Sequence, residues 1–238
     1  MKIVAHRGYS AKYPENSFAS FDAAIAAGAD YVETDVRMTR DGVLVCSHDP
    51  DLKRIAGRAT KIADTTVAEL ASIALPSGGG VLRLDAVLAH VRGRAAVMLD
   101  VKIDADDERR AIIACVAAAG MTNDIVYGVR NAQHARALID DGASFARLAM
   151  PAEPAQLEDF PMDGLAGVRL WEEQVSDAAI ARIRAARLPV WVTAGVRKAG
   201  EAPGYITAER LRVLKSLGID AVLVNDVELA LGVARGEG

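Results

Sequence analysis

Acidic side chains stand at the ends of two short apolar segments, each two residues from another charged side chain. Glu33 and Asp35 follow the first segment, and Asp100 and Lys102 follow the second. Side chains two residues apart in a strand point the same way, so each pair would project from one side of a strand end. Three carboxylates meeting there predict a divalent metal site at Glu33, Asp35 and Asp100, for magnesium or calcium and with manganese as a further candidate, because these hard cations take oxygen ligands. The alternative interpretation is a set of unrelated strand-end charges paired with basic neighbours such as Arg37.

Two of the four histidines also end apolar segments. These are His6 and His48, whereas His90 and His134 fall in predicted helices and are interpreted as surface or packing residues. A histidine at a strand end usually performs acid–base chemistry or binds metal. In a pair, one ring would remove a proton from an attacking hydroxyl and the other would protonate the leaving oxygen, each contributing about 10²–10⁴ in rate. The sequence therefore predicts His6 and His48 as a catalytic acid–base pair.

Basic side chains adjoin both groups. Arg7 directly follows His6, and Lys102 lies two residues after Asp100. A guanidinium presents donors that match two phosphate oxygens, and an ammonium group adds a point charge. Together with a metal they would neutralise a phosphodiester and the extra charge of its transition state. We therefore expect Arg7 and Lys102 to bind the phosphate of a small-molecule substrate.

The composition excludes several classes of protein. The chain has 238 residues, of which 51% are hydrophobic and 25% charged, so a large core can form. Its net charge of −4 argues against nucleic acid as the main partner. We see no signal peptide and no apolar run of about 18 residues that would span a membrane. The two cysteines, Cys46 and Cys115, lack a paired spacing, and these features together predict a cytoplasmic protein.

Short β-branched segments alternate with longer alanine-rich segments at helical spacing. The predicted strands are 3–6, 31–36, 43–47, 96–102, 125–128, 145–150, 165–170, 189–193 and 221–225. The predicted helices are 17–27, 85–91, 106–119, 132–140, 177–186, 207–217 and 226–234. This alternation indicates an α/β fold with parallel strands and crossover helices, and the length suits a single barrel domain over 1–238. Nine strands are one too many for an eight-stranded barrel, and the short turn at 40–42 indicates that one strand near it lies outside the barrel wall.

Several segments resemble the glycerophosphodiester phosphodiesterase family in order and spacing. They are His6-Arg7-Gly8, Pro14-Glu15-Asn16-Ser17, the run from Gly28 to Val36, Thr39-Arg40-Asp41-Gly42, His48-Asp49, Leu52-Lys53-Arg54 and, less closely, the run from Leu217 to Asp226. The resemblance implies a TIM-type (β/α)8 barrel with a small insertion after the second catalytic histidine, here about 49–80, with a short helix near 67–73. It also implies a bound divalent metal and hydrolysis of glycerophosphodiesters to glycerol 3-phosphate and an alcohol. In the family picture the glycerol 2-hydroxyl attacks phosphorus first and gives a cyclic phosphate that water then opens.

The chain departs from the family pattern at several positions. Asp100 stands where the family usually has glutamate, and the family's later motifs are altered near Arg130 and over 191–194. The changes near Arg130 and over 191–194 keep open a phosphodiesterase for another head group, such as a sugar-phosphate diester or a lysophospholipid. The aspartate at position 100 alone keeps open a catalytically silent barrel that binds a phosphorylated metabolite. Arg130 would contact a second negative charge or be solvated, and Trp171 would form a substrate lip or pack in a loop. The segment before the first helix has two interpretations as well, an N-cap at Asn16 or Ser17 and a role for Glu15 in the site.

Overall fold

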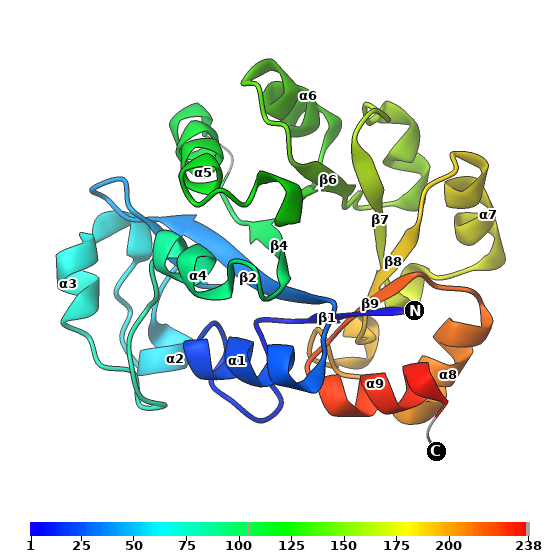
Figure 1. Cartoon of the computed structure of the whole chain (residues 1–238), viewed down its shortest axis with the longest axis horizontal. Coiled ribbons are helices and arrows are strands. Elements are labelled where there is room, and N and C mark those ends of the chain that lie inside the picture. The colour runs from blue at the N-terminus through cyan, green and yellow to red at the C-terminus, as the bar shows by residue number, and fades with distance from the viewer. Residues whose placement is uncertain (104, 237–238) are drawn as a thin grey trace.

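The computed structural model describes residues 1–103 and 105–236, and its centre is a barrel of parallel strands surrounded by helices (Figure 1). The strands are β1 (Lys2–Ala5), β2 (Tyr31–Met38), β3 (Leu44–Cys46), β4 (Ala96–Val101), β5 (Ile125–Val129), β6 (Ala146–Ala149), β7 (Leu165–Trp171), β8 (Val190–Thr193) and β9 (Ala221–Val224). Their order is β1-β9-β8-β7-β6-β5-β4-β2-β3, and an additional pairing of β1 with β2 closes the sheet on itself. The predicted TIM-type barrel is therefore confirmed.

The ninth strand lies outside the barrel wall, as the short turn before it indicated. β3 pairs with the end of β2 in the antiparallel direction, and Val36 lies opposite Cys46. The other neighbours pair in parallel, which requires a crossover connection between consecutive strands. A hairpin needs no crossover, so β3 extends β2 without adding a barrel strand.

Helices fill the crossovers and cover the outside of the barrel. They are α1 (Phe18–Ala27), α2 (Lys53–Ala56), α3 (Val67–Ala71), α4 (Leu84–Val91), α5 (Asp106–Ala118), α6 (Ala132–Asp140), α7 (Asp177–Ala185), α8 (Ala208–Ser216) and α9 (Val227–Arg235). Short 3₁₀ helices are η1 (Ile62–Asp64), η2 (Thr122–Asp124), η3 (Pro154–Asp159), η4 (Glu172–Gln174) and η5 (Arg197–Ala199). Each predicted helix is present within a residue or two of its expected ends. The described helices include none that is long and apolar enough to cross a membrane.

The segment after β3 forms a projection beside the barrel, drawn in cyan in Figure 1. It contains α2, η1 and α3, and α2 was not predicted from the sequence. A small apolar cluster holds it together, in which Leu52, Ile62 and Leu70 pack with Val45 of β3. The rest of the molecule builds on a larger core between the strands and the helices.

The interior of the barrel is a second, smaller apolar layer that determines where the polar residues lie. Its members include Val4, Met98, Leu148 and Leu223, one from each of four strands. Because side chains alternate along a strand, the residue two positions later in each strand also points inward, nearer the carboxyl end. The apolar layer therefore lies directly below the polar side chains at the carboxyl ends of the strands, which are called the upper barrel.

A glycine after β1 is expected to be irreplaceable for steric reasons. Gly8 has a φ of +78°, and a Cβ added there would lie 2.3 Å from Ser20 Oγ and 2.7 Å from the Ser20 carbonyl carbon. Gly8→Ala should lower the free energy of unfolding in urea by well over the roughly 1–2 kcal/mol that a left-handed conformation alone costs. Gly42→Ala is the matched control, because Gly42 has a φ of +77° with open space around it. Equal losses in the two variants would contradict the steric explanation.

Candidate active site

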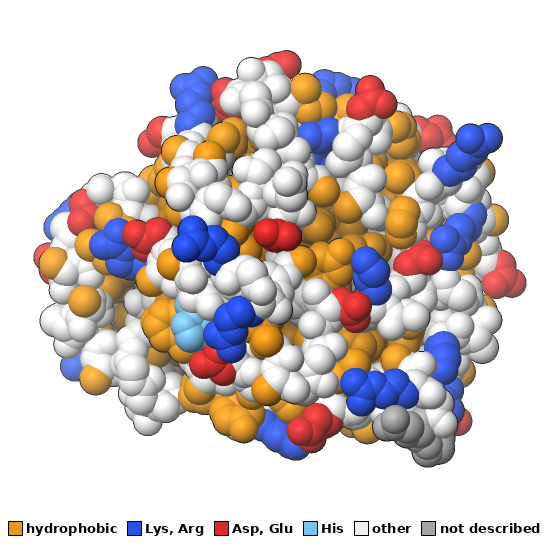
Figure 2. Space-filling model, in the orientation of Figure 1, with side chains coloured by type: hydrophobic (Ala, Val, Ile, Leu, Met, Phe, Trp, Pro, Cys, Tyr) orange, Lys and Arg blue, Asp and Glu red, His pale blue; other side chains and the backbone are white. Residues whose placement is uncertain are grey.

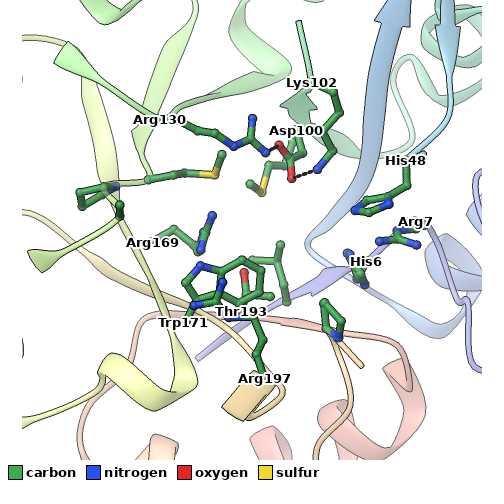
Figure 3. Close-up of a pocket in the computed structure, with 16 residues that line it drawn as sticks. His6, Arg7, His48, Asp100, Lys102, Arg130, Arg169, Trp171, Thr193 and Arg197 are labelled. Atoms are coloured by element: carbon green, nitrogen blue, oxygen red, sulfur yellow. Dashed lines mark hydrogen bonds and ion pairs between the residues drawn. The ribbon is translucent and has the colours of Figure 1, made fainter. Parts of the chain in front are cut away.

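The polar side chains of the upper barrel line a cavity of about 430 Å³ at the carboxyl ends of the strands. Its charged and imidazole side chains are His6, Arg7, His48, Asp100, Lys102, Arg130, Arg169 and Arg197. Figure 3 shows His6, Arg7 and His48 on one side of this cavity and Arg169 with Trp171 on the other. The predicted histidines, the phosphate-binding residues and Asp100 thus line one cavity, and the other two carboxylates, Glu33 and Asp35, lie next to Asp100.

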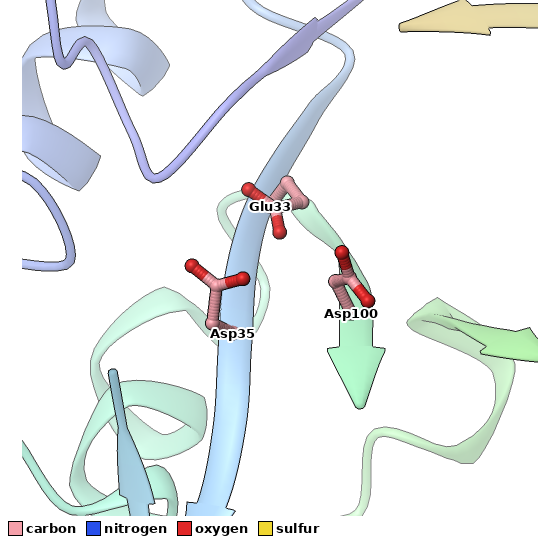
Figure 4. A group of neighbouring side chains, drawn as sticks. All are labelled: Glu33, Asp35 and Asp100. Carbon is pink, nitrogen blue, oxygen red and sulfur yellow. The ribbon is translucent and has the colours of Figure 1, made fainter. Parts of the chain in front are cut away.

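Glu33, Asp35 and Asp100 point toward one another from β2 and β4 (Figure 4). One oxygen of each carboxylate lies within 4.8 Å of one oxygen of both others. Burial and the charges of Asp35 and Asp100 raise the pKa of Glu33 well above its ordinary value. Burial also acts to raise the pKa of Asp100, but Lys102 and Arg130 outweigh it and hold that pKa below its usual range. Three carboxylates this close are electrostatically costly without a cation among them.

The donor atoms fit a divalent cation. Asp35 is fully buried, and its Oδ1 atom accepts no well-aligned hydrogen bond, although Lys102 Nζ lies 3.0 Å away. A buried carboxylate oxygen without a hydrogen bond is unusual and is open to a further ligand. Hard cations such as magnesium, calcium and manganese take oxygen ligands of this kind. Glu33, Asp35 and Asp100 are therefore the residues that would hold a metal.

Two residues with strained backbones support the carboxylates. Arg7 has a φ of +56° and donates its main-chain N–H to Glu33 Oε2 at 2.7 Å, while its Nε lies 3.2 Å from Asp35 Oδ2. Asn16 has a φ of +51°, donates from Nδ2 to Asp35 Oδ2 at 3.2 Å and accepts from Thr34 Oγ1 at 2.8 Å. Positive φ values at non-glycine residues are costly and gather at functional sites. The sequence interpretation missed this role of Asn16.

The segment before α1 caps that helix and also contacts an arginine of the cavity. Ser17 caps α1, accepting from the Ser20 N–H, in a capping box. Glu15 accepts from Arg7 Nη1 at 3.2 Å and from Arg54 Nη1 at 2.6 Å. Burial acts to raise the pKa of Glu15, but the two guanidinium groups outweigh it and lower that pKa. Glu15 therefore orients the arginine that lines the cavity and ties it to the projection that contains Arg54.

His6 is held by a hydrogen bond from the far end of the chain. Its Nδ1 lies 2.8 Å from Asn225 Oδ1, at the end of β9. Asn225 Nδ2 donates to Pro203 O at 3.0 Å, which fixes the amide orientation, so Oδ1 accepts and we assign the proton of His6 to Nδ1. Burial and the neighbouring Arg7 lower the pKa of His6 to about 4. The ring is therefore neutral near pH 7, with a lone pair on Nε2.

His48 has a carboxylate partner instead of an amide. Its Nδ1 lies 2.7 Å from Asp49 Oδ1, and Arg54 Nε donates to Asp49 Oδ2 at 2.5 Å. Burial acts to raise the pKa of Asp49, but hydrogen bonds from His48 and Arg54 outweigh it and keep that pKa low. Arg37 also donates to the His48 main-chain oxygen, at 2.6 Å from Nη2. The two histidines of the cavity thus differ in their partners.

Lys102 and Arg130 lie on either side of Asp100 (Figure 3). Lys102 Nζ is 2.6 Å from Asp100 Oδ2, and Arg130 is ion-paired with Asp100 Oδ1. Arg130 thus pairs with a carboxylate of the protein while 42% of its side chain is exposed, and its contact with a substrate charge stays a prediction.

The sequence interpretation missed the basic residues on the far side of the cavity. Arg169 lies on β7, and Arg197 begins η5. Their side chains lie over the Trp171 ring, with guanidinium carbons 4.4 Å and 4.0 Å from its centre. A lone arginine within the apolar run of a predicted inner strand was the signal that could have identified Arg169.

Two substitutions of Asn225, the partner of His6, should distinguish the effect of orienting the His6 ring from the effect of a charge beside it. Asn225→Leu should lower kcat by about tenfold or more, part of the 10²–10⁴ that a positioned acid or base contributes. Asn225→Asp retains an acceptor, but its carboxylate favours the imidazolium and should raise the pKa of His6. The acid limb of the kcat/KM profile should then move to higher pH, because protonated His6 cannot accept a proton. Unchanged profiles for Asn225→Asp would show that His6 does not act as the base.

Comparison with known proteins identifies the family. The model of the glycerophosphoryl diester phosphodiesterase family matches residues 6–139, more than half of the chain. The chain belongs to this family. The match includes both histidines and the three carboxylates of the site, whereas Arg169, Trp171 and Asn225 lie beyond it.

Curated relatives named as glycerophosphodiester phosphodiesterases align with part of the chain. A probable glycerophosphodiester phosphodiesterase 1 of Mycobacterium tuberculosis is 52% identical over 68 residues, which are 29% of this chain. That alignment spans 25% of the relative's own length.

Solved structures of the family match over nearly the whole barrel. A glycerophosphodiester phosphodiesterase from Agrobacterium tumefaciens is 27% identical with a TM-score of 0.78, covering 97% of this chain and 99% of that one. An Oleispira antarctica phosphodiesterase, solved in complex with the product sn-glycerol-3-phosphate, has a TM-score of 0.80 at 20% identity and covers 99% of this chain and 97% of its own. The second likeness concerns the fold alone.

Proposed function

We propose that this protein hydrolyses glycerophosphodiesters to glycerol 3-phosphate and an alcohol with the help of a divalent metal. The observation that carries the proposal is that Asp100, one of three clustered carboxylates, lines the same cavity as His6 and His48. Acidic clusters are common by themselves, and so are histidines. Their combination with phosphate-matching cations at the carboxyl edge of a barrel supports phosphodiester chemistry.

The metal would be held by the three carboxylates and would supply Lewis-acid stabilisation of phosphate charge. The chain contributes the remaining electrostatics. Arg7 and Lys102 both line the cavity and are mostly buried, with 11% and 13% of their side chains exposed. Charged donors in such a partly dry site stabilise developing phosphate charge more strongly than they would in water.

The two histidines would move the protons. Neutral His6, with its lone pair on Nε2, accepts the proton of the attacking hydroxyl. His48, held at Nδ1 by Asp49, donates a proton from Nε2 to the leaving alcohol oxygen. With the glycerol 2-hydroxyl as the attacking group, a cyclic phosphate forms, and water opens it with the proton roles reversed.

Product identification tests the proposal. Glycerophosphoethanolamine would be incubated with the protein and magnesium, calcium or manganese, and phosphorus NMR would follow the products. We expect glycerol 3-phosphate and free ethanolamine. Release of phosphoethanolamine and glycerol would indicate cleavage of the other ester bond, and unchanged substrate with every metal would overturn the proposal in favour of a binding protein.

A different head group remains the second candidate, and one observation favours it. The cavity wall opposite the histidines contains Arg169, Trp171 and Arg197, outside the region that the family model matches. These three residues lie away from the histidines, so they would affect the choice of alcohol more than the reaction itself.

A further inference from the structure

The cavity wall opposite the histidines carries an excess of positive charge. Arg130 is ion-paired with Asp100, and Arg197 Nη2 lies 2.8 Å from Glu173 Oε1. Arg169 has no such partner among the described residues. Its nearest aromatic contact is the face of Trp171, 4.4 Å from the guanidinium carbon.

Arg169 is buried in a way that is difficult to explain as structural. The residue is 5% exposed, and its Nε and Nη1 atoms have no hydrogen-bond partner. Burial lowers the pKa of Arg169 to about 10, so the side chain still carries its charge at neutral pH. A buried guanidinium with unpartnered donors is strongly unfavourable, and such groups persist where a ligand completes them.

The position of Arg169 on β7 directs it into the cavity. Arg169 pairs with Trp191, a member of the barrel's interior layer, and it lines the cavity itself. Figure 3 shows its guanidinium facing the space that Asp100 and His6 border from the other side. The Arg169 guanidinium therefore borders the same space as the proposed reaction centre.

We propose that Arg169 binds an oxyanion, a carboxylate or a phosphate, on the alcohol half of the substrate. The proposal rests on the proposed function and specifies its substrate class: glycerophosphodiesters whose head group carries a further negative charge. A guanidinium presents a planar set of donors that matches either oxyanion with two parallel hydrogen bonds. The scissile phosphate would lie at the histidine side, near Arg7 and Lys102, and the second anion on the Arg169 side.

The same wall is unfavourable for a cationic head group. Aromatic faces bind quaternary ammonium groups such as choline, but two guanidinium carbons already lie within 4.4 Å of the Trp171 ring centre. A choline placed there would meet positive charge. The arrangement thus disfavours glycerophosphocholine while it favours an anionic alcohol.

A matched pair of substrates tests the proposal. Glycerophosphoserine and glycerophosphoethanolamine differ by one carboxylate on the alcohol half. We expect kcat/KM to be about tenfold or more higher for the serine compound, the usual effect of a hydrogen bond to a charged group. Arg169→Met should lower kcat/KM for the serine compound about tenfold or more relative to the ethanolamine compound, so that the preference disappears. Arg92→Met, at an exposed arginine after α4, is the control and should retain the preference.

A phosphorylated alcohol distinguishes the two oxyanions. We would compare kcat/KM for a glycerophosphodiester with a phosphate ester on its alcohol half and for the same compound without that ester. The ratio shows whether a phosphate raises kcat/KM more than a carboxylate does. Equal kcat/KM for anionic and zwitterionic substrates in the unmodified protein would overturn the proposal. An equal loss for all substrates in Arg169→Met would also overturn it, because Arg169 would then bind the scissile phosphate.

A binding measurement keeps this inference separate from the proposed function. O-phosphoserine and phosphoethanolamine differ by the same carboxylate and can be titrated by thermal denaturation without turnover. We expect a larger rise in melting temperature with O-phosphoserine, and no difference between the two ligands in Arg169→Met. Loss of turnover on every diester with this binding difference intact would contradict the proposed function alone. Absence of the binding difference would contradict the role of Arg169 alone. Without ligand, Arg169→Met should melt no lower than the unmodified protein, since it removes an uncompensated buried charge.

Discussion

Replacing His48 by asparagine is expected to lower kcat by about 10²–10⁴, the usual contribution of one positioned acid or base. The same is expected for His6→Asn. Steady-state kinetics with saturating metal would measure both effects. Metal affinity should change little, because neither ring belongs to the group of three carboxylates.

His90→Asn is the matched control for these variants. His90 lies on α4 and contacts Asp22 at 2.8 Å, outside the cavity. It should retain full turnover. Near-normal kcat in His48→Asn would contradict the acid–base assignment, whereas a large loss in His90→Asn would show that the losses reflect folding.

Replacing Asp35 by asparagine is expected to weaken metal binding by well over tenfold. Asp35 is fully buried, and the amide oxygen that replaces its carboxylate carries no full negative charge. Calorimetric titration of metal-stripped protein with manganese or magnesium would measure the affinity. Turnover should fall with it and should recover in part at high metal concentration, unlike the loss in His48→Asn.

Asp124→Asn provides the control for the loss of one carboxylate. Asp124 is exposed in η2, before β5, at the opposite end of the barrel from the cavity. It should bind metal as the unmodified protein does. If Asp35→Asn bound metal equally well, the three carboxylates would not form the metal site.

The substitution of aspartate for the family's usual glutamate does not disrupt the carboxylate group. Asp100 on β4 pairs in register with Asp35 on β2, so the two residues stand level across the sheet. Level positions allow the shorter side chain to come within 4.8 Å of both partners. This geometry removes the one feature of the sequence that favoured a catalytically silent barrel.

Local patterns in the sequence predicted the features that depend on residues close together in the chain, such as the strands and the side from which their charged residues project. Strand alternation placed Glu33 with Asp35 and Asp100 with Lys102, and it indicated that a strand near the turn at 40–42 would leave the barrel wall. The ends of strands shifted by a residue or two, because hydrogen-bond partners across the sheet decide where a strand stops. Helix α2, of four residues, lacks the length that a periodic pattern needs.

Contacts between residues far apart in the chain could not be predicted from the sequence. Asn225 meets His6 across 219 positions of the chain, which no local spacing encodes. Arg169 was placed in a predicted strand, but its inward direction depends on the irregular register between β6 and β7 at Arg147 and Leu148. The residues proposed for the reaction could therefore be predicted from the sequence, whereas the cavity wall that would select the alcohol could not.

The most direct test of the whole account is the release of glycerol 3-phosphate from glycerophosphoethanolamine and glycerophosphoserine by EDTA-stripped protein, before and after one divalent metal is added back. The account predicts no release from the stripped protein, recovery with magnesium, calcium or manganese, and no recovery in His6→Asn. Full release by the stripped protein would contradict the metal site, and absence of release with every metal, from folded protein, would contradict the proposed reaction.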